Sequence, residues 1–143
     1  MKKKLTAILS AVLFAGTLAN GAVTASANNY TDTTFHFYYE ADGTDTAIEP
    51  RDKMDNTASY VKLNSSSTDL MVCVAGTNSK TSYNAINPNL CSSFVYVPRG
   101  DYKYISNTVY GNYKYAYLVM GSGIGGRQLV SGKWSPDNIS GRY

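Results

Sequence analysis

The stretch "TTFHFYYE", from Thr33 to Glu40, changes character at every second residue. One side of an extended chain here carries Phe35, Phe37 and Tyr39, and the other side carries Thr34, His36, Tyr38 and Glu40. Successive side chains of a β-strand point to opposite faces of the sheet, so this period of two indicates a strand with one buried face. The stretch therefore predicts a strand whose phenylalanine side faces a core.

The same strand signals continue along the rest of the chain. Alternating or continuous apolar runs occur in "ASYVKLN" (58–64), "LMVCVAG" (70–76), "SSFVYV" (92–97) and "RQLVSGKW" (127–134). Turn residues such as Gly43, Pro88 and Pro98 separate these runs, and no long helical periodicity follows the first 27 residues. About seven short strands at this spacing predict an all-β fold, either an antiparallel β-sandwich or a small barrel.

One pair of runs predicts a hairpin. "YKYISNTVYGNYKYAYLVM", residues 102–120, holds a Gly-Asn pair at 111–112 between two alternating stretches, and glycine supplies the positive φ of a two-residue hairpin loop. Pairing across this loop gives one face rich in tyrosine: Tyr104, Tyr110, Tyr113, Tyr115 and Tyr117. These five residues are the candidate ligand-binding side chains. An exposed face forms a rigid amphipathic platform, whereas a buried one needs a partner for every hydroxyl, and both alternatives stay open.

The N-terminal residues have the pattern of a secretory signal peptide. Three lysines follow Met1, an apolar stretch runs from Leu5 to Leu18, and Ala25-Ser26-Ala27 is a small-x-small cleavage signal. We expect residues 1–27 to be removed and residues 28–143 to form a single secreted, extracellular β domain. The leader is too short and interrupted for a stable membrane span, and no other apolar run approaches that length.

The two cysteines, Cys73 and Cys91, lie in the exported part of the chain. Exported proteins with an even number of cysteines usually pair them, so we expect one structural disulfide.

Charge argues against a nucleic-acid partner. Without the three leader lysines, the chain has ten basic and ten acidic residues, and so no overall basic excess of the kind that binds nucleic acid. The distribution is uneven: residues from Arg99 onward include six basic and two acidic residues. A basic C-terminal half favours an anionic wall or membrane surface, although such imbalance is also common on ordinary surfaces.

Catalytic and metal-binding signals are weak. His36 is the only histidine. Glu40, four residues later and two side chains along the same predicted face, is a possible orienting carboxylate. Acidic residues gather between Glu40 and Asp55, where calcium is an alternative to a solvated loop, but their spacing is not that of an EF-hand. No serine-hydrolase or zinc spacing is present. We expect no cofactor, no metal and no enzymatic activity.

Trp134, the only tryptophan, ends the last predicted strand on the same face as Val130. Gly132 between them leaves room for a large ring across the sheet, so we interpret Trp134 as a core pin. The alternative is an exposed, ligand-stacking tryptophan.

Three segments carry a resemblance to a known group of proteins. "RDKMDNTASYVKL" (51–63), "VPRGDYKYIS" (97–106) and "LVSGKWSPDNI" (129–139) resemble an uncharacterised family of small secreted proteins from Gram-positive bacteria. The terminal box of that family is similar to S-G-x-W-S-P-D-S, with Asn138 standing here where serine is usual. The resemblance implies export and a β fold, and it implies no catalytic residue.

These observations favour a secreted, non-enzymatic protein that uses a tyrosine-rich sheet face to bind a cell-surface glycan, peptide or protein. The alternative is a bacteriocin-like antagonist that acts on the envelope of a competitor.

Overall fold

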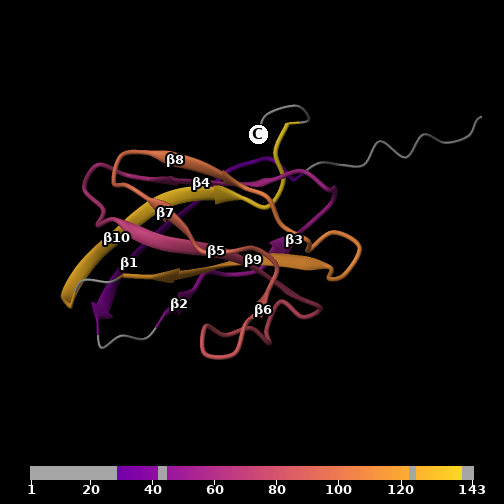
Figure 1. Ribbon diagram of the computed structural model, residues 1–143, viewed down its shortest axis with the longest axis horizontal. Helices are drawn as coiled ribbons and strands as arrows, with labels where there is room; N and C mark the ends of the chain where they lie inside the picture. The colour runs from indigo at the N-terminus through magenta and orange to yellow at the C-terminus, as the bar shows by residue number, and fades with distance from the viewer. Residues whose placement is uncertain (1–28, 42–44, 123–124, 140–143) are drawn as a thin grey trace, which may run out of the picture.

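The computed structural model describes residues 29–41, 45–122 and 125–139. The predicted signal peptide, residues 1–27, lies outside these ranges. The described residues form ten β-strands and no helix, arranged in two antiparallel sheets (Figure 1). Nothing in this part of the chain is a helix long and apolar enough to cross a bilayer.

The first sheet, sheet A, has four strands in the order β1-β10-β4-β8. They are β1 (Thr33–Ala41), β10 (Gly126–Ser135), β4 (Ser59–Leu63) and β8 (Tyr102–Ile105). Its longest pairing joins β1 to β10, which come from opposite ends of the described chain and lie side by side in Figure 1 in indigo and yellow.

The second sheet, sheet B, has six strands in the order β2-β9-β5-β6, with β3 also pairing β9 and β7 also pairing β5. They are β2 (Thr46–Ala47), β3 (Arg51–Asp52), β5 (Leu70–Thr77), β6 (Asn89–Leu90), β7 (Val95–Val97) and β9 (Tyr115–Gly121). Several of these strands are only two residues long, and for that reason the sequence pattern gave about seven strands. The prediction of an all-β antiparallel sandwich is confirmed, and the described strands do not close into a barrel.

The main core lies between the two sheets. Sheet A contributes Phe35, Val61 and Val130, and sheet B contributes Val72 and Leu118, each at most 9% exposed. Because β-strand side chains alternate, the residues between them point outward, as the alternation in β1 predicted. On the outer face of sheet A, His36 and Tyr38 of β1 and Tyr102 of β8 are exposed, whereas Ser131 and Ser135 of β10 are buried.

Trp134 is 1% exposed and belongs to the main core. Gly132 does make room for an aromatic ring, but the ring belongs to Phe35, its direct partner across the β1–β10 pairing. A Cβ on Gly132 would lie 2.7 Å from Cζ of Phe35 and 2.2 Å from the carbonyl oxygen of Lys62. Gly132 thus permits both close packing of the ring and close approach of the neighbouring strand.

The predicted hairpin at 111–112 does not form, because β8 is in sheet A and β9 is in sheet B. Gly111 does have a positive φ of 85°, but the turn belongs to a loop that crosses between the sheets. The amides of Asn112 and Tyr113 both donate to the carbonyl of Val109, at 3.0 and 2.8 Å. Val109 is fully buried in the core between the sheets, which an isolated ribbon could not achieve.

The predicted disulfide is wrong: Cys73 and Cys91 are buried free thiols. Cys73 belongs to a small cluster on the outer side of sheet B, whereas Cys91 belongs to the main core. The amide of Cys91 donates to the carbonyl of Val74, so Cys91 lies opposite a residue whose side chain faces inward. The two sulfurs therefore belong to opposite faces of sheet B, and two thiols so placed cannot bond without backbone movement.

Candidate binding site

The five tyrosines predicted to share one face are distributed over both sheets and the loop between them. Tyr104 is in β8 of sheet A, Tyr115 and Tyr117 are in β9 of sheet B, and Tyr110 and Tyr113 lie in the crossing loop. Tyr110 is 49% exposed, whereas Tyr113 packs partly buried against the main core. Only Tyr104 lies on the outer face of sheet A.

Tyr117 is a structural residue of the small outer cluster of sheet B. It is 2% exposed, and its hydroxyl donates a hydrogen bond of 3.2 Å to the carbonyl of Asn84. The ring of Tyr83 contacts it edge-on at a centroid distance of 5.7 Å. Burial raises the pKa of Tyr117 above its ordinary value. With its hydroxyl paired and its ring covered, Tyr117 is not available to a ligand.

A different set of tyrosines does gather on the outer face of sheet A. Tyr60 of β4 pairs directly with Tyr104 of β8, and Tyr102 is the next outward residue along β8. The ring centroids of Tyr60 and Tyr104 are 5.4 Å apart, those of Tyr102 and Tyr104 are 5.7 Å apart, and those of Tyr60 and Tyr102 are 5.9 Å apart. These distances lie in the range of favourable aromatic pairs, so the rings support one another in a fixed arrangement. Tyr102, at the sheet edge, is 50% exposed.

Two lysines complete this surface. Lys62 pairs with Tyr102 on one side and with Lys133 of β10 on the other, so all three side chains point outward together. The ammonium of Lys133 lies 5.8 Å from the ring centroid of Tyr60, a cation–π contact. We call the set of Tyr60, Lys62, Tyr102, Tyr104 and Lys133 the tyrosine–lysine face.

An acidic neighbour fixes the charge of this face. Asp32 forms an ion pair with Lys133, and this hydrogen bond raises the pKa of the lysine, which stays protonated at neutral pH. Burial raises the pKa of the Tyr60 hydroxyl, so that residue stays neutral. The face therefore combines aromatic rings with the cationic side chain of Lys62 and with the Lys133–Asp32 ion pair.

A shallow hollow of about 230 Å³ adjoins the tyrosine–lysine face. It is lined by Tyr30, Asp32, Tyr60, Tyr104, Ser135, Asn138 and Ile139. The lining offers aromatic surface together with hydroxyl, amide and carboxylate groups. Such a mixture of flat apolar surface and a few directed polar groups is typical of ligand sites.

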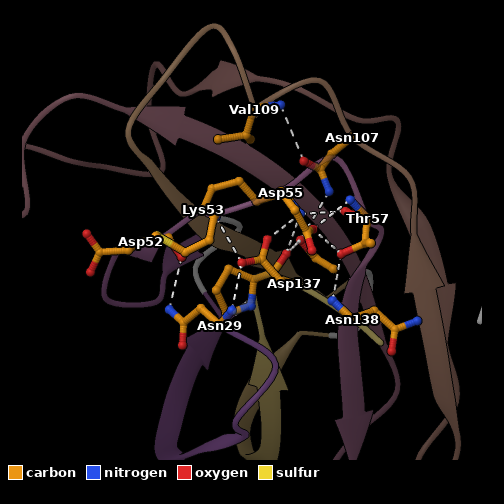
Figure 2. Close-up of polar contacts among 12 residues, drawn as sticks. Asn29, Asp52, Lys53, Asp55, Thr57, Asn107, Val109, Asp137 and Asn138 are labelled. Carbon is orange, nitrogen blue, oxygen red and sulfur yellow. Dashed lines mark hydrogen bonds and ion pairs between the residues drawn. The ribbon is translucent and has the colours of Figure 1, made fainter. Parts of the chain in front are cut away.

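A buried ion pair lies next to the hollow, because one of its members, Asp137, directly precedes the lining residues Asn138 and Ile139. The ammonium of Lys53 lies 2.9 Å from Oδ1 of Asp137, and neither side chain is exposed to solvent. Lys53 also donates to the carbonyls of Thr57 and Pro136, the latter at 2.7 Å. The buried ammonium of Lys53 thus has two carbonyl acceptors and one counter-charge, Oδ1 of Asp137. Figure 2 shows Lys53, Thr57 and Asp137 converging on this point.

The second oxygen of Asp137, Oδ2, accepts two backbone hydrogen bonds. They come from the backbone amides of Asn29, at 3.0 Å, and Met54, at 2.9 Å. Arg51 extends the network by donating to the side-chain oxygen of Asn29 at 2.7 Å and to the carbonyl of Trp134 at 2.9 Å. The beginning of the described chain, the segment around β3 and the last strand are thereby joined.

We call the network of Lys53 and Asp137 with Asn29, Arg51, Met54, Thr57 and Pro136 the clasp. The clasp is a structural element and not a reactive centre. Oδ1 of Asp137 is held by the ion pair with Lys53, Oδ2 accepts two backbone hydrogen bonds, and both side chains are closed to solvent. A nucleophile or general base needs access to a substrate. The role of the clasp is to hold Asn29 and Asn138, and with them the adjoining residues that line the hollow.

The weaker catalytic and metal hypotheses gain no site. His36 is on the exposed side of β1, and its ring centroid lies 6.3 Å from that of Tyr38. The side chain of its proposed partner Glu40 lies outside the described residues. Among the described residues, no group of three or more metal-ligating side chains comes together. Within the predicted acidic loop, Asp55 bonds the amide of Thr57 and Asp52 pairs with Lys80.

The family model described as "Protein of unknown function (DUF2712)" matches residues 22–138, and the chain belongs to this uncharacterised family. The match ends at Asn138, the last residue of the segment that forms the clasp. No curated protein and no solved structure matches the chain.

Sequence reasoning missed Tyr60, Tyr102 and both lysines of the face. Each of them was visible as an outward position of an alternating run, Tyr60 and Lys62 in "ASYVKLN" and Tyr102 beside Tyr104 in "DYKYI". The missing information was the strand order, because β4, β8 and β10 are distant in sequence and become neighbours only in sheet A. The Lys53–Asp137 pair escaped prediction for the same reason.

Proposed function

We propose that the protein is an exported, non-enzymatic binding protein that attaches to a cell-surface glycan through its tyrosine–lysine face. The observation that carries this proposal is the side-by-side arrangement of Tyr60, Tyr102 and Tyr104 on one outward sheet face, with Lys62 and Lys133 beside them. The predicted function remains a proposal, and Tyr60, Tyr102, Lys62 and Lys133 are now proposed beside Tyr104 as the residues that serve it.

The chemistry of the face supports a glycan as ligand. Tyrosine presents a flat apolar ring for the C–H surface of a sugar and a hydroxyl for its polar edge, at low cost in side-chain entropy. The rings contact one another and Lys133 contacts Tyr60, so much of the surface is ordered before a ligand arrives. Lys62 attracts the negative charge that wall polymers carry, whereas Asp32 already neutralises Lys133.

The test is co-sedimentation of the purified mature chain with insoluble cell-wall glycan. Tyr102→Ala removes a half-exposed ring of the face, and Tyr110→Ala is the matched control because its ring is almost equally exposed but lies in the crossing loop. We expect Tyr102→Ala to weaken binding about tenfold, equivalent to about 1.4 kcal/mol, as is common for an aromatic contact residue. Tyr110→Ala should bind as the unmodified protein does.

The lysines give a second readout in the same assay. Lys62→Gln should weaken binding at low salt and reduce its salt dependence, because one charge contact is lost. Equal binding of the Tyr102→Ala and Tyr110→Ala variants to the glycan would contradict the proposal. So would equal sedimentation of the unmodified protein with an insoluble matrix that carries no glycan.

The antagonistic function is the alternative use of the same face, since the partly exposed Lys62 suits the anionic envelope of a competing cell. Growth arrest of related bacteria by purified mature protein, lost in Lys62→Gln, would favour it. Binding to wall glycan without any effect on growth would favour the simple binding function.

A further inference from the structure

A second cavity, separate from the tyrosine–lysine face, opens along one edge of the sandwich. It has a volume of about 780 Å³ and lies between β1, the edge strand of sheet A, and the segment that contains β2 and β3. Phe35 and Phe37 line it from β1, Ile48 lines it from the opposite side, and Trp134 belongs to its wall. Its size is within the range of clefts that hold ligands.

The β1 wall of this groove is a strand edge without a partner among the described strands. All nine residues of β1 pair with β10 on one side, and none is paired on the other. At about 3.3 Å per residue this edge is about 30 Å long, and it presents backbone N–H and C=O groups along its length. The opposite wall does not use them, because β2 and β3 are two-residue strands that both pair with β9.

The charges of the groove do not select an ionic ligand. Its lining includes two basic residues, Arg51 and Lys80, and two acidic ones, Glu49 and Asp52. Lys80 and Asp52 neutralise each other at 2.8 Å. Arg51 is directed inward, toward the carbonyl of Trp134 and the clasp. These four charged residues balance, and the rest of the lining combines apolar side chains such as Phe37 and Ile48 with polar ones such as Thr34 and His36, beside the backbone groups of β1.

We propose that this groove binds an extended peptide that adds as a strand to the free edge of β1 and directs apolar side chains between the two sheets. Backbone groups arranged at strand spacing are matched by another extended backbone, the mode of recognition known as β-augmentation. Neighbours on the same face of a sheet contact each other, so every second residue of the added strand lies beside Phe35 or Phe37 and faces Ile48. The ligand is thus a peptide with alternating apolar residues and no required charge.

The test begins with a phage-displayed library of random peptides selected against the mature protein. We expect the enriched peptides to alternate apolar and polar residues. The strongest of them is then synthesised in two forms, each with backbone N-methyl groups on every second residue but in opposite registers. Because a strand uses only one edge to pair with β1, one form should bind more than about tenfold more weakly and the other should bind almost normally.

Hydrogen exchange locates the bound peptide on the protein. Amides of β1 should exchange more slowly with peptide present, and those of β8, on the far edge of sheet A, should be unchanged. Glu49→Trp, a substitution of an exposed residue that lines the groove, should abolish selection by filling it, and Tyr102→Ala should not. The contrast separates this proposal from glycan binding by the tyrosine–lysine face.

Three results would overturn the proposal. One is enrichment of the same peptides by Glu49→Trp, and another is equal loss of binding in both N-methylated registers. The third is a concentration-dependent dimer in which the β1 amides are protected without peptide, because a second copy of the chain would then cover the edge.

Discussion

Replacing Asp137 with asparagine tests the energetic role of the clasp. Asparagine keeps the size of the side chain and one acceptor oxygen but removes the negative charge that lies 2.9 Å from the ammonium of Lys53. Both side chains are completely buried, so the remaining ammonium has neither counter-charge nor water. Breaking a buried pair in this way costs about 3–5 kcal/mol. That is a large part of the roughly 5–15 kcal/mol that stabilises a typical domain.

Urea unfolding measured by Trp134 fluorescence gives this loss directly, because the only tryptophan is buried and lies next to the clasp. With a slope of about 2 kcal/mol per molar urea, a loss of about 4 kcal/mol lowers the midpoint by about 2 M.

The chain contains its own control for this experiment. Lys80 and Asp52 form an ion pair of nearly the same length, 2.8 Å, but both side chains are half exposed. Lys80→Met should therefore lower the urea midpoint far less than Asp137→Asn does. If Asp137→Asn costs no more than Lys80→Met, the clasp does not depend on a buried charge pair and the reasoning is refuted.

Two further predictions concern packing and the thiols. Gly132→Ala should lower the thermal midpoint strongly, because the added Cβ would meet the Lys62 carbonyl at 2.2 Å and the Phe35 ring at 2.7 Å; an unchanged midpoint in a calorimetric scan would contradict this. Cys73 and Cys91 should both react with a thiol reagent after unfolding without reductant and neither should react before it. Burial raises the pKa of Cys73 to about 12, so the native thiol stays protonated at pH 8. The stability that this residue contributes falls as the pH rises from the pKa of the unfolded thiol toward 12, because only the unfolded thiol ionises in that range. A mass two hydrogens lower than that of the reduced chain would instead reveal a disulfide.

The features that could be predicted from the sequence are those encoded within single strands. The alternation around Phe35 and Phe37 gave both the strand and its buried side, because the period of two depends only on neighbouring residues. The continuous apolar run around Val72 likewise gave a central strand, which the structure places in sheet B as β5. Local pattern was therefore sufficient for the fold class.

Features that depend on how strands pair could not be predicted. Gly111 has a positive φ as a hairpin glycine would, yet its turn closes onto the carbonyl of Val109, and the strands on either side belong to different sheets with Val109 buried between them. Two cysteines in a chain with a predicted export signal suggested a disulfide, but strand register sends their sulfurs to opposite faces. In each case tertiary packing overrides a valid local signal.

The candidate site shows the same limit. An excess of tyrosine was visible in the composition, and Tyr104 was one of five candidates on a face for which burial and exposure both stayed open. Its partners Tyr60 and Lys133 come from strands that no sequence pattern places beside it. The type of surface could be predicted, whereas its membership needed the order of strands in sheet A.

The most direct test of the central claim is a tyrosine nitration footprint of the mature protein with and without wall glycan, read by peptide mass spectrometry. If the tyrosine–lysine face is the binding surface, glycan should protect Tyr102 and Tyr104 and leave the nitration of Tyr110 unchanged. Equal nitration of Tyr102 in the free and bound protein, or protection of Tyr110 alone, would contradict the account.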